Sequence, residues 1–438
     1  MNPVDRTPVQ LITGLDRFAV VRVANCLTRP GTALISLDLR GVDTGHVVRA
    51  VRRIRRDGSE HFTLDDLELE HGCASCTIRL DLLPLLRTLS RDPEVERIVV
   101  ALDPTIEPEP LAVEVLTTIV DVPGLPSAPA ADDVAIDAVI CAIDAATWLP
   151  HATGDETAYE AGVSAIEDER TLAQIAVAQT RFADVMIVEF ADRMDSAYDL
   201  ARLHATLLRL NPLAAMRTLN SQNTVSPAVM ESALADIPDG TPRGRPHRPF
   251  DPLLAGYPDL TSDCGIALLT FETNRPFHPE RLHDEFDCLL DGVVTARGRM
   301  WLAANPDDVL WLESAGGALG VARVGSWLAA AADGGESVDP FDVDPEYRAL
   351  AALHWDPVFG DRHTSLTVLT HRAEPAEIDA ALTRALVTHE EFARGPEYLA
   401  SLPSPFGDEH TDPCDDMDPI DPTASDVRSS TGEQGEDR

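Results

Sequence analysis

Residues 9–21 read VQLITGLDRFAVV, and their pattern indicates the fold class of the chain. The apolar run from Val9 to Thr13 ends at Gly14, as expected of a buried strand followed by a turn. Further near-continuous apolar runs alternate with helical patterns, which predicts a doubly wound α/β domain with a parallel sheet over residues 1–235. Its other strands are expected at 32–39, 98–102, 135–143 and 185–188, and its helices at 47–56, 81–89, 172–180 and 197–210.

A segment rich in Pro, Gly and Arg follows at residues 236–262 and is expected to be a linker. Short strands separated by turns then predict a smaller α+β domain over residues 263–403, with a mostly antiparallel sheet. The acidic segment 404–438 is short of large apolar residues and is expected to be disordered. In the smaller domain, strands are expected at 266–273, 293–303, 309–313, 319–324 and 365–370, and helices at 278–290 and 375–392.

Composition excludes several kinds of protein. The 438 residues include 74 Asp and Glu against 35 basic residues, a net charge of -39 that disfavours non-specific nucleic-acid binding and leaves no expected DNA partner. All 35 basic residues are arginine, which rules out a P-loop lysine or a lysine base. The seven cysteines suggest no disulfide framework. With no apolar leader and no apolar run near ~18 residues, a cytoplasmic protein without membrane contact is expected.

The loop after the first strand departs from a nucleotide-binding loop. After such a strand one looks for G-x-x-x-x-G-K-[ST]. In this chain Ala19 replaces the second glycine of that pattern, Val20 replaces the lysine and Val21 replaces the hydroxyl residue. Asp16 and Phe18 stand where backbone N–H groups cradle phosphate. The sequence therefore predicts an ordinary strand-to-helix turn without nucleotide-binding residues.

Two thiols, Cys73 and Cys76, lie three residues apart and are the candidate metal ligands. A closed zinc site needs four ligands; His71 is a plausible third, and the fourth would come from elsewhere. A redox role and a pair of inert buried cysteines are the two alternatives. Asp81 is expected to cap the helix that follows, with Pro84 in its first turn.

Four arginines are candidate ribosome or RNA contacts. Arg49, Arg52, Arg53 and Arg56 are spaced i, i+3, i+4 and i+7, which places them on one face of the expected helix. Arginine forks suit phosphate, so this stripe is a hypothesis for rRNA contact. The alternative is a solvated face paired with acidic neighbours such as the residues of the run 65–70.

Over nearly its whole length the chain resembles the CobW family of P-loop GTPases and metallochaperones. Residues 72–77 (GCASCT) match the family's G-C-x-C-C metal motif, with Ser75 as the middle residue. The switch segment E-T-x-G is ALDP at 101–104, and in the segment 189–192, where N-K-x-D is expected, only Asp192 matches. The resemblance implies a degenerate P-loop-like domain, a CobW C-terminal domain, and loss of GTPase activity.

Residues 289–303 and 311–317 narrow the resemblance to an actinobacterial branch of the family that is produced under zinc starvation. This resemblance implies a non-enzymatic adaptor that recruits the hibernation promoting factor to 70S ribosomes lacking zinc-binding ribosomal protein paralogues. It implies no required cofactor and leaves zinc binding at Cys73 and Cys76 open. The alternative is a CobW-type, GTP-dependent zinc metallochaperone with weak GTPase activity.

Overall fold

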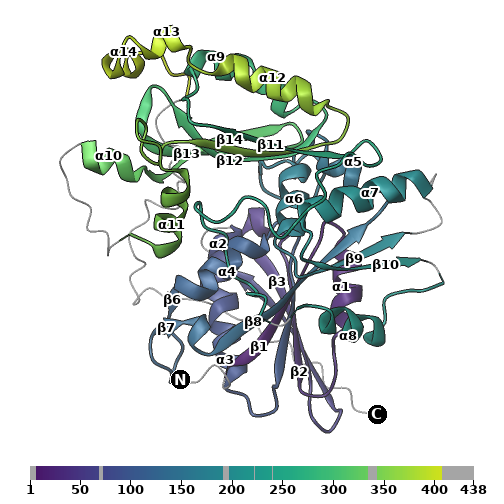
Figure 1. The fold of residues 1–438 in the computed structure, drawn as a ribbon. Helices are drawn as coiled ribbons and strands as arrows, with labels where there is room; N and C mark the ends of the chain where they lie inside the picture. The colour runs from purple at the N-terminus through teal and green to yellow at the C-terminus, as the bar shows by residue number, and fades with distance from the viewer. Residues whose placement is uncertain are drawn as a thin grey trace.

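The computed structural model of the chain describes residues 6–68, 73–190, 197–220, 222–238, 240–333 and 343–406. Two β-sheets dominate it, an eight-stranded sheet and a five-stranded sheet. Helices α6 (Leu172–Arg181) and α7 (Ala197–Leu210) lie between the two sheets, as Figure 1 shows. Most of the expected tail, residues 407–438, lies outside the described residues.

The larger sheet confirms the predicted α/β class. Its order is β10-β9-β8-β1-β5-β2-β3-β4. Neighbours from β10 to β2 pair in parallel, and β3 and β4 extend the sheet as an antiparallel hairpin. The strands are β1 (Thr7–Thr13), β2 (Thr32–Asp38), β3 (His46–Ile54), β4 (Glu60–Glu68), β5 (Arg97–Ala101), β8 (Val134–Asp144), β9 (Val185–Phe190) and β10 (Ala215–Asn220), and a separate pair is β6 (Ile119–Val120) with β7 (Ala128–Pro129).

Helices cover both faces of this sheet. Val23 of α1 (Arg17–Cys26) and Met230 of α8 (Pro227–Ala235) pack in the core on one face. The other face is covered by helices α3 to α7. Because parallel strands end at the same edge, the loops after β1, β2 and β5 meet there. The remaining helices are α2 (Ala74–Thr77), α3 (Leu83–Ser90), α4 (Pro108–Thr117) and α5 (Trp148–Ala152).

The helix expected at 47–56 is wrong, because these residues form strand β3, paired on both sides. Val47 and Val51 are buried, and a spacing of four places two residues on one face of a helix and of a strand alike. The missed signal is Asp57-Gly58, a typical hairpin turn before β4, where Gly58 has φ +84°. β-Branched valines also favour the strand.

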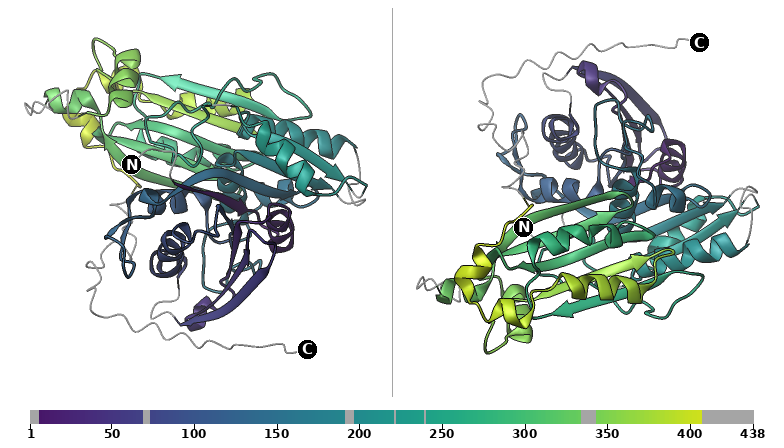
Figure 2. Two further views of the ribbon diagram at one scale, coloured as in Figure 1. Left: turned by 90° about the horizontal axis from the view of Figure 1, so that it is seen from below. Right: turned by 90° about the horizontal axis from the view of Figure 1, so that it is seen from above.

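The five-stranded sheet is antiparallel throughout, in the order β11-β15-β12-β13-β14, as expected for the smaller domain. Helices α9 (Pro279–Asp284) and α12 (Pro375–Ala385) pack on one face of it, through Leu282 and Leu382. The view from above in Figure 2 shows helices lying across this sheet. The elements are β11 (Ala267–Thr273), α9 (Pro279–Asp284), a 3₁₀ turn (Phe286–Leu289), β12 (Val293–Leu302), β13 (Asn305–Ala315), β14 (Ala318–Ser326), α10 (Leu328–Asp333), α11 (Pro345–His354), β15 (Thr364–Thr370), α12 (Pro375–Ala385), α13 (His389–Phe392) and α14 (Pro396–Ala400).

The two domains pack directly against one another through a shared apolar core. Val294 and Leu369 of the smaller sheet share a core cluster with Leu203 of α7. Gly316 has φ +54°, and an added Cβ would lie 2.2 Å from the carbonyl oxygen of Gly154, so this approach requires glycine. Residues 236–262 form no helix or strand among those described. None of the described helices is long and apolar enough to span a membrane.

Candidate functional site

The loop between β1 and α1 is the place where a P-loop would hold phosphate. It spans only Gly14 to Asp16, because α1 begins at Arg17. A Cβ at Gly14 would lie 2.5 Å from the carbonyl oxygen of Ala142, which explains why this glycine is present. Asp16 caps α1 by accepting a hydrogen bond from Phe18 N at 2.8 Å. A fixed carboxylate thus lies at the helix N-terminus, the position that favours phosphate in a P-loop.

The side chains of residues 18–21 do not point toward the loop between β1 and α1. Ala19 and Val20 are 3% and 1% exposed and pack into the core beneath α1. Val21 is partly exposed, and Phe18 is 83% exposed on the surface. A lysine at the position of Val20 would therefore enter the core in this arrangement, instead of reaching toward the loop.

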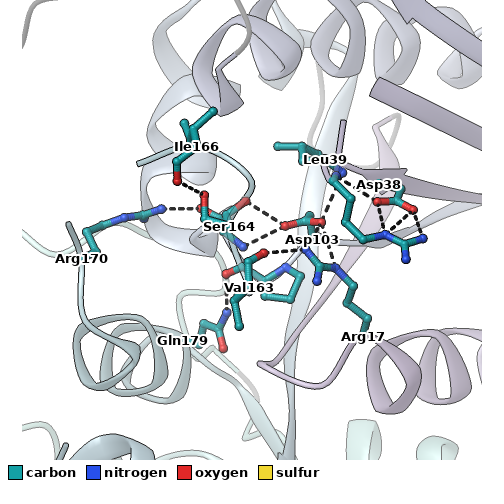
Figure 3. A network of polar contacts seen from close by, with 12 residues as sticks. Arg17, Asp38, Leu39, Asp103, Val163, Ser164, Ile166, Arg170 and Gln179 are labelled. Atoms are coloured by element: carbon teal, nitrogen blue, oxygen red, sulfur yellow. Dashed lines mark hydrogen bonds and ion pairs between the residues drawn. The ribbon is translucent and has the colours of Figure 1, made fainter. Parts of the chain in front are cut away.

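Arg17 joins this loop to the segment after β5. Its guanidinium donates to Oδ2 of Asp103 from Nη2 at 2.9 Å and from Nε at 3.2 Å. The Asp103 side chain is completely buried, whereas 28% of the Arg17 side chain is exposed. Arg17 Nη2 also donates to the carbonyl oxygen of Val163 at 2.8 Å, as Figure 3 shows. An internal ion pair therefore bridges the two loops.

The segment after β5 is fixed by further hydrogen bonds. Asp103 accepts from Leu39 N at 3.3 Å and from both the backbone N and the hydroxyl of Thr105 at 3.1 and 2.8 Å. Gln179 Nε2 donates to the carbonyl oxygen of Pro104 at 3.0 Å, and Arg170 donates to that of Thr105 at 3.0 Å. The network, seen in Figure 3, ties α1, β2, α6 and the loop before α6 to this one segment.

The segment expected to hold the guanine motif lies at the end of β9, at the same edge of the sheet, and its first residue contacts α1. Glu189 accepts an ion-paired hydrogen bond from Arg22 of α1. That contact raises the pKa of Arg22 above its ordinary value. Ala191 and Asp192, the second half of the motif position, lie outside the described residues.

Cys73 and Cys76 lie together at the start of a helix. Cys73 is the N-cap of α2, and its Sγ accepts a hydrogen bond from Cys76 N at 3.2 Å. Both residues are partly exposed. His71, the suggested third ligand, lies outside the described residues. Within the described part of the chain, no group of three or more His, Cys, Asp or Glu is arranged to hold a metal.

The helix after the cysteines differs from the expectation. Helical turns continue from α2 through a π-helical segment (Ile78–Leu82) into α3, so Asp81 is inside the helix and is not its cap. Leu83 N donates to the carbonyl oxygen of Ile78, five residues back. The wider turn gives a physical reason for Pro84, which has no N–H to donate and whose ring would crowd a regular turn.

The four candidate arginines do not form one stripe, because successive side chains of a strand point to opposite faces. Arg49 pairs with Asp65 at 2.7 Å and with Asp81 on one face of β3, whereas Arg52 bonds Asn25 at 2.9 Å and Thr28 at 3.0 Å on the other. Arg53 approaches Asp92 at 3.5 Å, and Arg56, beyond the strand end, pairs with Glu96 at 3.1 Å. All four thus have acidic or polar neighbours within the chain.

Burial raises the pKa of Asp81 to about 6, even though Arg49 opposes the shift. Sequence reasoning missed this contact and also the Arg17–Asp103 pair. Asp103 was read only as a residue of a lost switch motif. One signal could have linked Arg17 with Asp103. The arginine follows a short loop after one buried strand, and the acid directly follows another strand that ends at the same edge of the sheet.

Comparison with protein-family models gives two matches. The model for the nucleotide-binding domain of CobW/HypB/UreG matches residues 43–218. The model for the C-terminal domain of the cobalamin synthesis protein CobW matches residues 266–386. The first match begins after β2 and so does not include the loop that follows β1.

Relatives cover almost the whole chain. The zinc chaperone Rv0106 of Mycobacterium tuberculosis is 42% identical over 435 residues, which is 99% of this chain and 100% of that protein. The zinc-regulated GTPase metalloprotein activator 1 of Dictyostelium discoideum is 25% identical over 345 residues, or 75% of this chain and 67% of that protein.

Among solved structures, the Zn(II)-bound YjiA GTPase of E. coli aligns with 88% of this chain and 99% of its own, at 14% identity and a TM-score of 0.33. That similarity is too low for any comparison of side chains. The two domain matches and the 42% identity over the full length of a relative show the family. The chain belongs to the CobW family.

Proposed function

We propose that the protein is a zinc-handling member of the CobW family that does not hydrolyse GTP. The observation that carries the zinc part is the placement of Cys73 and Cys76 one turn apart at the start of a helix, partly exposed, with Cys73 at the N-cap. The name of the 42% identical relative, a zinc chaperone, supports the same proposal. His71, two residues before Cys73, is the third ligand that we propose.

The chemistry of the pair suits zinc. Thiolates are preferred zinc ligands, and two of them leave positions for a histidine and for a ligand from a partner or from water. Such an open site holds zinc exchangeably, as handing the ion to another protein requires.

The test is a zinc titration of the metal-free full chain in competition with a chromophoric chelator. One zinc per chain is expected, and the Cys73→Ser/Cys76→Ser variant should lose at least about tenfold in affinity. Serine keeps an N-cap acceptor, so loss of zinc is separated from loss of the cap. Cys288→Ser is the matched control, since burial raises the pKa of Cys288 to about 11 and disfavours its thiolate. Equal zinc affinity in the double-serine variant and the control would overturn the assignment.

The proposed lack of hydrolysis rests on the internal ion pair and on the absent lysine. Arg17 and Asp103 occupy the two loops that hold and sense phosphate in a P-loop enzyme, and no lysine is present to replace the missing one. The rival function is a GTP-dependent zinc metallochaperone, which the names of the relatives favour. Fluorescent GTP and GDP analogues with magnesium separate the two. We expect no saturable binding and no phosphate release, and turnover that Asp103→Asn abolishes would favour the rival.

A second proposed function is the adaptor that recruits the hibernation promoting factor to 70S ribosomes when zinc is scarce. Its support is the resemblance of residues 289–303 and 311–317 to that branch of the family. Loss of hydrolysis is compatible with both proposals. The arginines proposed for ribosome contact carry partners of their own; of these, Arg56 has the most exposed paired side chain, at 59%.

Sedimentation of the tagged chain through sucrose gradients tests the adaptor. Co-migration with ribosomes only in zinc-starved lysate, with less hibernation factor on ribosomes from a deletion strain, is the expected result. An Arg56→Glu variant should then shift toward the top of the gradient. A protein that stays at the top in both lysates would remove the adaptor function and leave the zinc proposal standing.

A further inference from the structure

A cavity of about 80 Å³ lies between the two domains. The ends of α6 and α7 form one side, strands β12 and β15 the other, and residues 252–255 help to close it. Its lining includes three arginines, one from each of α6, α7 and β12: Arg181, Arg209 and Arg297. Among the described residues, no Asp or Glu lines it. In a chain of net charge -39, a collection of cations without acids in the lining runs against the overall charge.

The three guanidinium groups differ in what holds them. Arg181 pairs with Glu313 and donates to Thr295 Oγ1 at 3.0 Å. Arg209 is 7% exposed, and among the described residues it donates to two carbonyl oxygens, those of Ala205 at 2.9 Å and Thr261 at 2.6 Å. Its Nε is buried and has no acceptor in the described part of the chain. The hydrogen bonds of Arg209 within the described residues therefore go to neutral groups, although Asp259 lies near enough to act on its charge.

Arg297 is the least satisfied of the three. Its Nε is buried without an acceptor among the described residues, and its guanidinium makes no ion pair with any of them. The ring of Trp311 lies 5.5 Å from it, a contact that leaves the N–H groups unused. Glu313 is its direct partner across the β12–β13 ladder, but this carboxylate binds Arg181 and Trp311 Nε1.

The acids around the cavity lie outside its lining. Glu313 and Glu109 act on Arg297, and Glu109 is bound to His247 at 3.0 Å, whereas Asp259 acts on Arg209. Burial, with Arg181 acting in the same direction, lowers the pKa of Arg297 to about 9. Arg181 is matched by Glu313, but Arg297 and Arg209 make no ion pair among the described residues. Two guanidinium groups without a directly bonded carboxylate in a partly enclosed space favour the entry of an anion.

We propose that this cavity binds a small oxyanion, a phosphate or carboxylate group, held by the guanidinium groups of Arg297 and Arg209. The planar fork of arginine matches both kinds of anion in bidentate fashion. A space of this size accommodates a few water molecules or one such group. Because the lining comes from both domains, the bound anion stabilises their packing, and its binding is coupled to the stability of the whole chain.

The experiment is thermal unfolding and calorimetric titration of the full chain with inorganic phosphate and, separately, with acetate, against chloride at matched ionic strength. We expect a saturable rise in Tm with at least one of the two, and the anion that gives it identifies the ligand class. Arg297→Gln should weaken the affinity about tenfold or more, since a charge-assisted hydrogen bond is lost. Arg384→Gln is the matched control: this arginine of the smaller domain pairs with Glu285 at 2.8 Å and does not line the cavity.

The stability of Arg297→Gln without the anion separates a binding role from a structural one. In chloride it should unfold at the same Tm as the parent chain or higher, because an unpaired buried charge is removed, and in the binding anion the order should reverse. A variant destabilised equally in both buffers would show that Arg297 only packs on Trp311. Phosphate and sulfate stabilise most proteins without a site. An unsaturable rise shared by parent and variant, or no heat of binding at millimolar anion, would mean an adventitious ion only and overturn the proposal.

Discussion

Arg17, the first residue of α1, holds the completely buried carboxylate of Asp103 with two hydrogen bonds, at 2.9 and 3.2 Å. The two residues lie 86 positions apart and close the edge of the sheet where β1 and β5 end. In a P-loop enzyme the loops at this edge hold the phosphates and the magnesium ion between them. Here a charge pair belonging to the protein joins them, and Gln179 and Arg170 fix the second loop from the other side.

Restoring the missing lysine should damage the fold. Val20 is 1% exposed in the core beneath α1, so Val20→Lys buries an unpaired ammonium and should lower the free energy of unfolding by about 3 kcal/mol or more. Val21→Lys is the neighbouring control: Val21 is 43% exposed and should change stability by less than about 0.5 kcal/mol. Thermal unfolding of both variants checks this. Equal, small effects would mean that α1 has a different rotation in solution.

Arg49 should be a structural residue and Arg56 should not. Arg49 lies between Asp65 and Asp81, whose side chains are 13% and 12% exposed. Arg49→Gln leaves these two carboxylates without their cation, and a loss of about 1–3 kcal/mol is expected. Arg56→Gln removes a pair at the surface, which is worth about 0–1 kcal/mol. The difference in Tm between the two variants is the readout, and a more harmful Arg56→Gln would contradict these contacts.

The smaller domain should lose stability in mild acid. His363 is 2% exposed, and burial lowers its pKa to about 4. In the unfolded chain this histidine binds a proton near pH 6.5, whereas in the folded chain it stays neutral until about pH 4. The contribution of the neutral His363 to the free energy of unfolding is therefore present above about pH 6.5 and is lost as the pH falls toward 4. His371, whose pKa burial also lowers to about 4, acts in the same direction.

Unfolding of the parent chain and of His363→Gln from pH 7.5 to pH 5 measures this effect. The contribution of His363 should be on the order of 2 kcal/mol between pH 6.5 and pH 5. As the pH is lowered, the free energy of unfolding should therefore fall more steeply for the parent chain than for the variant. Parallel curves would show that His363 titrates normally in the folded protein.

Packing of the two domains should depend on Gly316. Gly316→Ala forces a residue with φ +54° to carry a Cβ 2.2 Å from the carbonyl oxygen of Gly154, and a cost of about 2–4 kcal/mol is expected. Gly320→Ala, in the exposed strand β14, meets nothing within 4 Å and should be nearly neutral. Limited proteolysis between the domains together with Tm checks the pair of variants. A Gly316→Ala variant with an unchanged Tm and an unchanged rate of proteolysis would contradict this close approach.

The α/β class, most of the strands and the antiparallel smaller sheet could be predicted from local patterns, because apolar periodicity and turn residues are local signals. The same signals failed at β3, where Val47 and Val51 fit helix and strand equally and long-range pairing with β2 and β4 decided the outcome. The departure of residues 14–21 from the spacing G-x-x-x-x-G-K-[ST] was also visible in the sequence, since a motif is defined by spacing alone.

Which charged side chains contact one another depends on the folded arrangement of the chain. Arg17 and Asp103, Arg49 and Asp81, and the three arginines of the interdomain cavity come from distant parts of the chain. No local pattern encodes such contacts, because the order of the strands in the sheet sets which loops share an edge and which helix ends face the second domain. The strength of each interaction also depends on the tertiary structure. Burial removes water from a carboxylate or guanidinium, and this desolvation disfavours its charged form unless a partner compensates it.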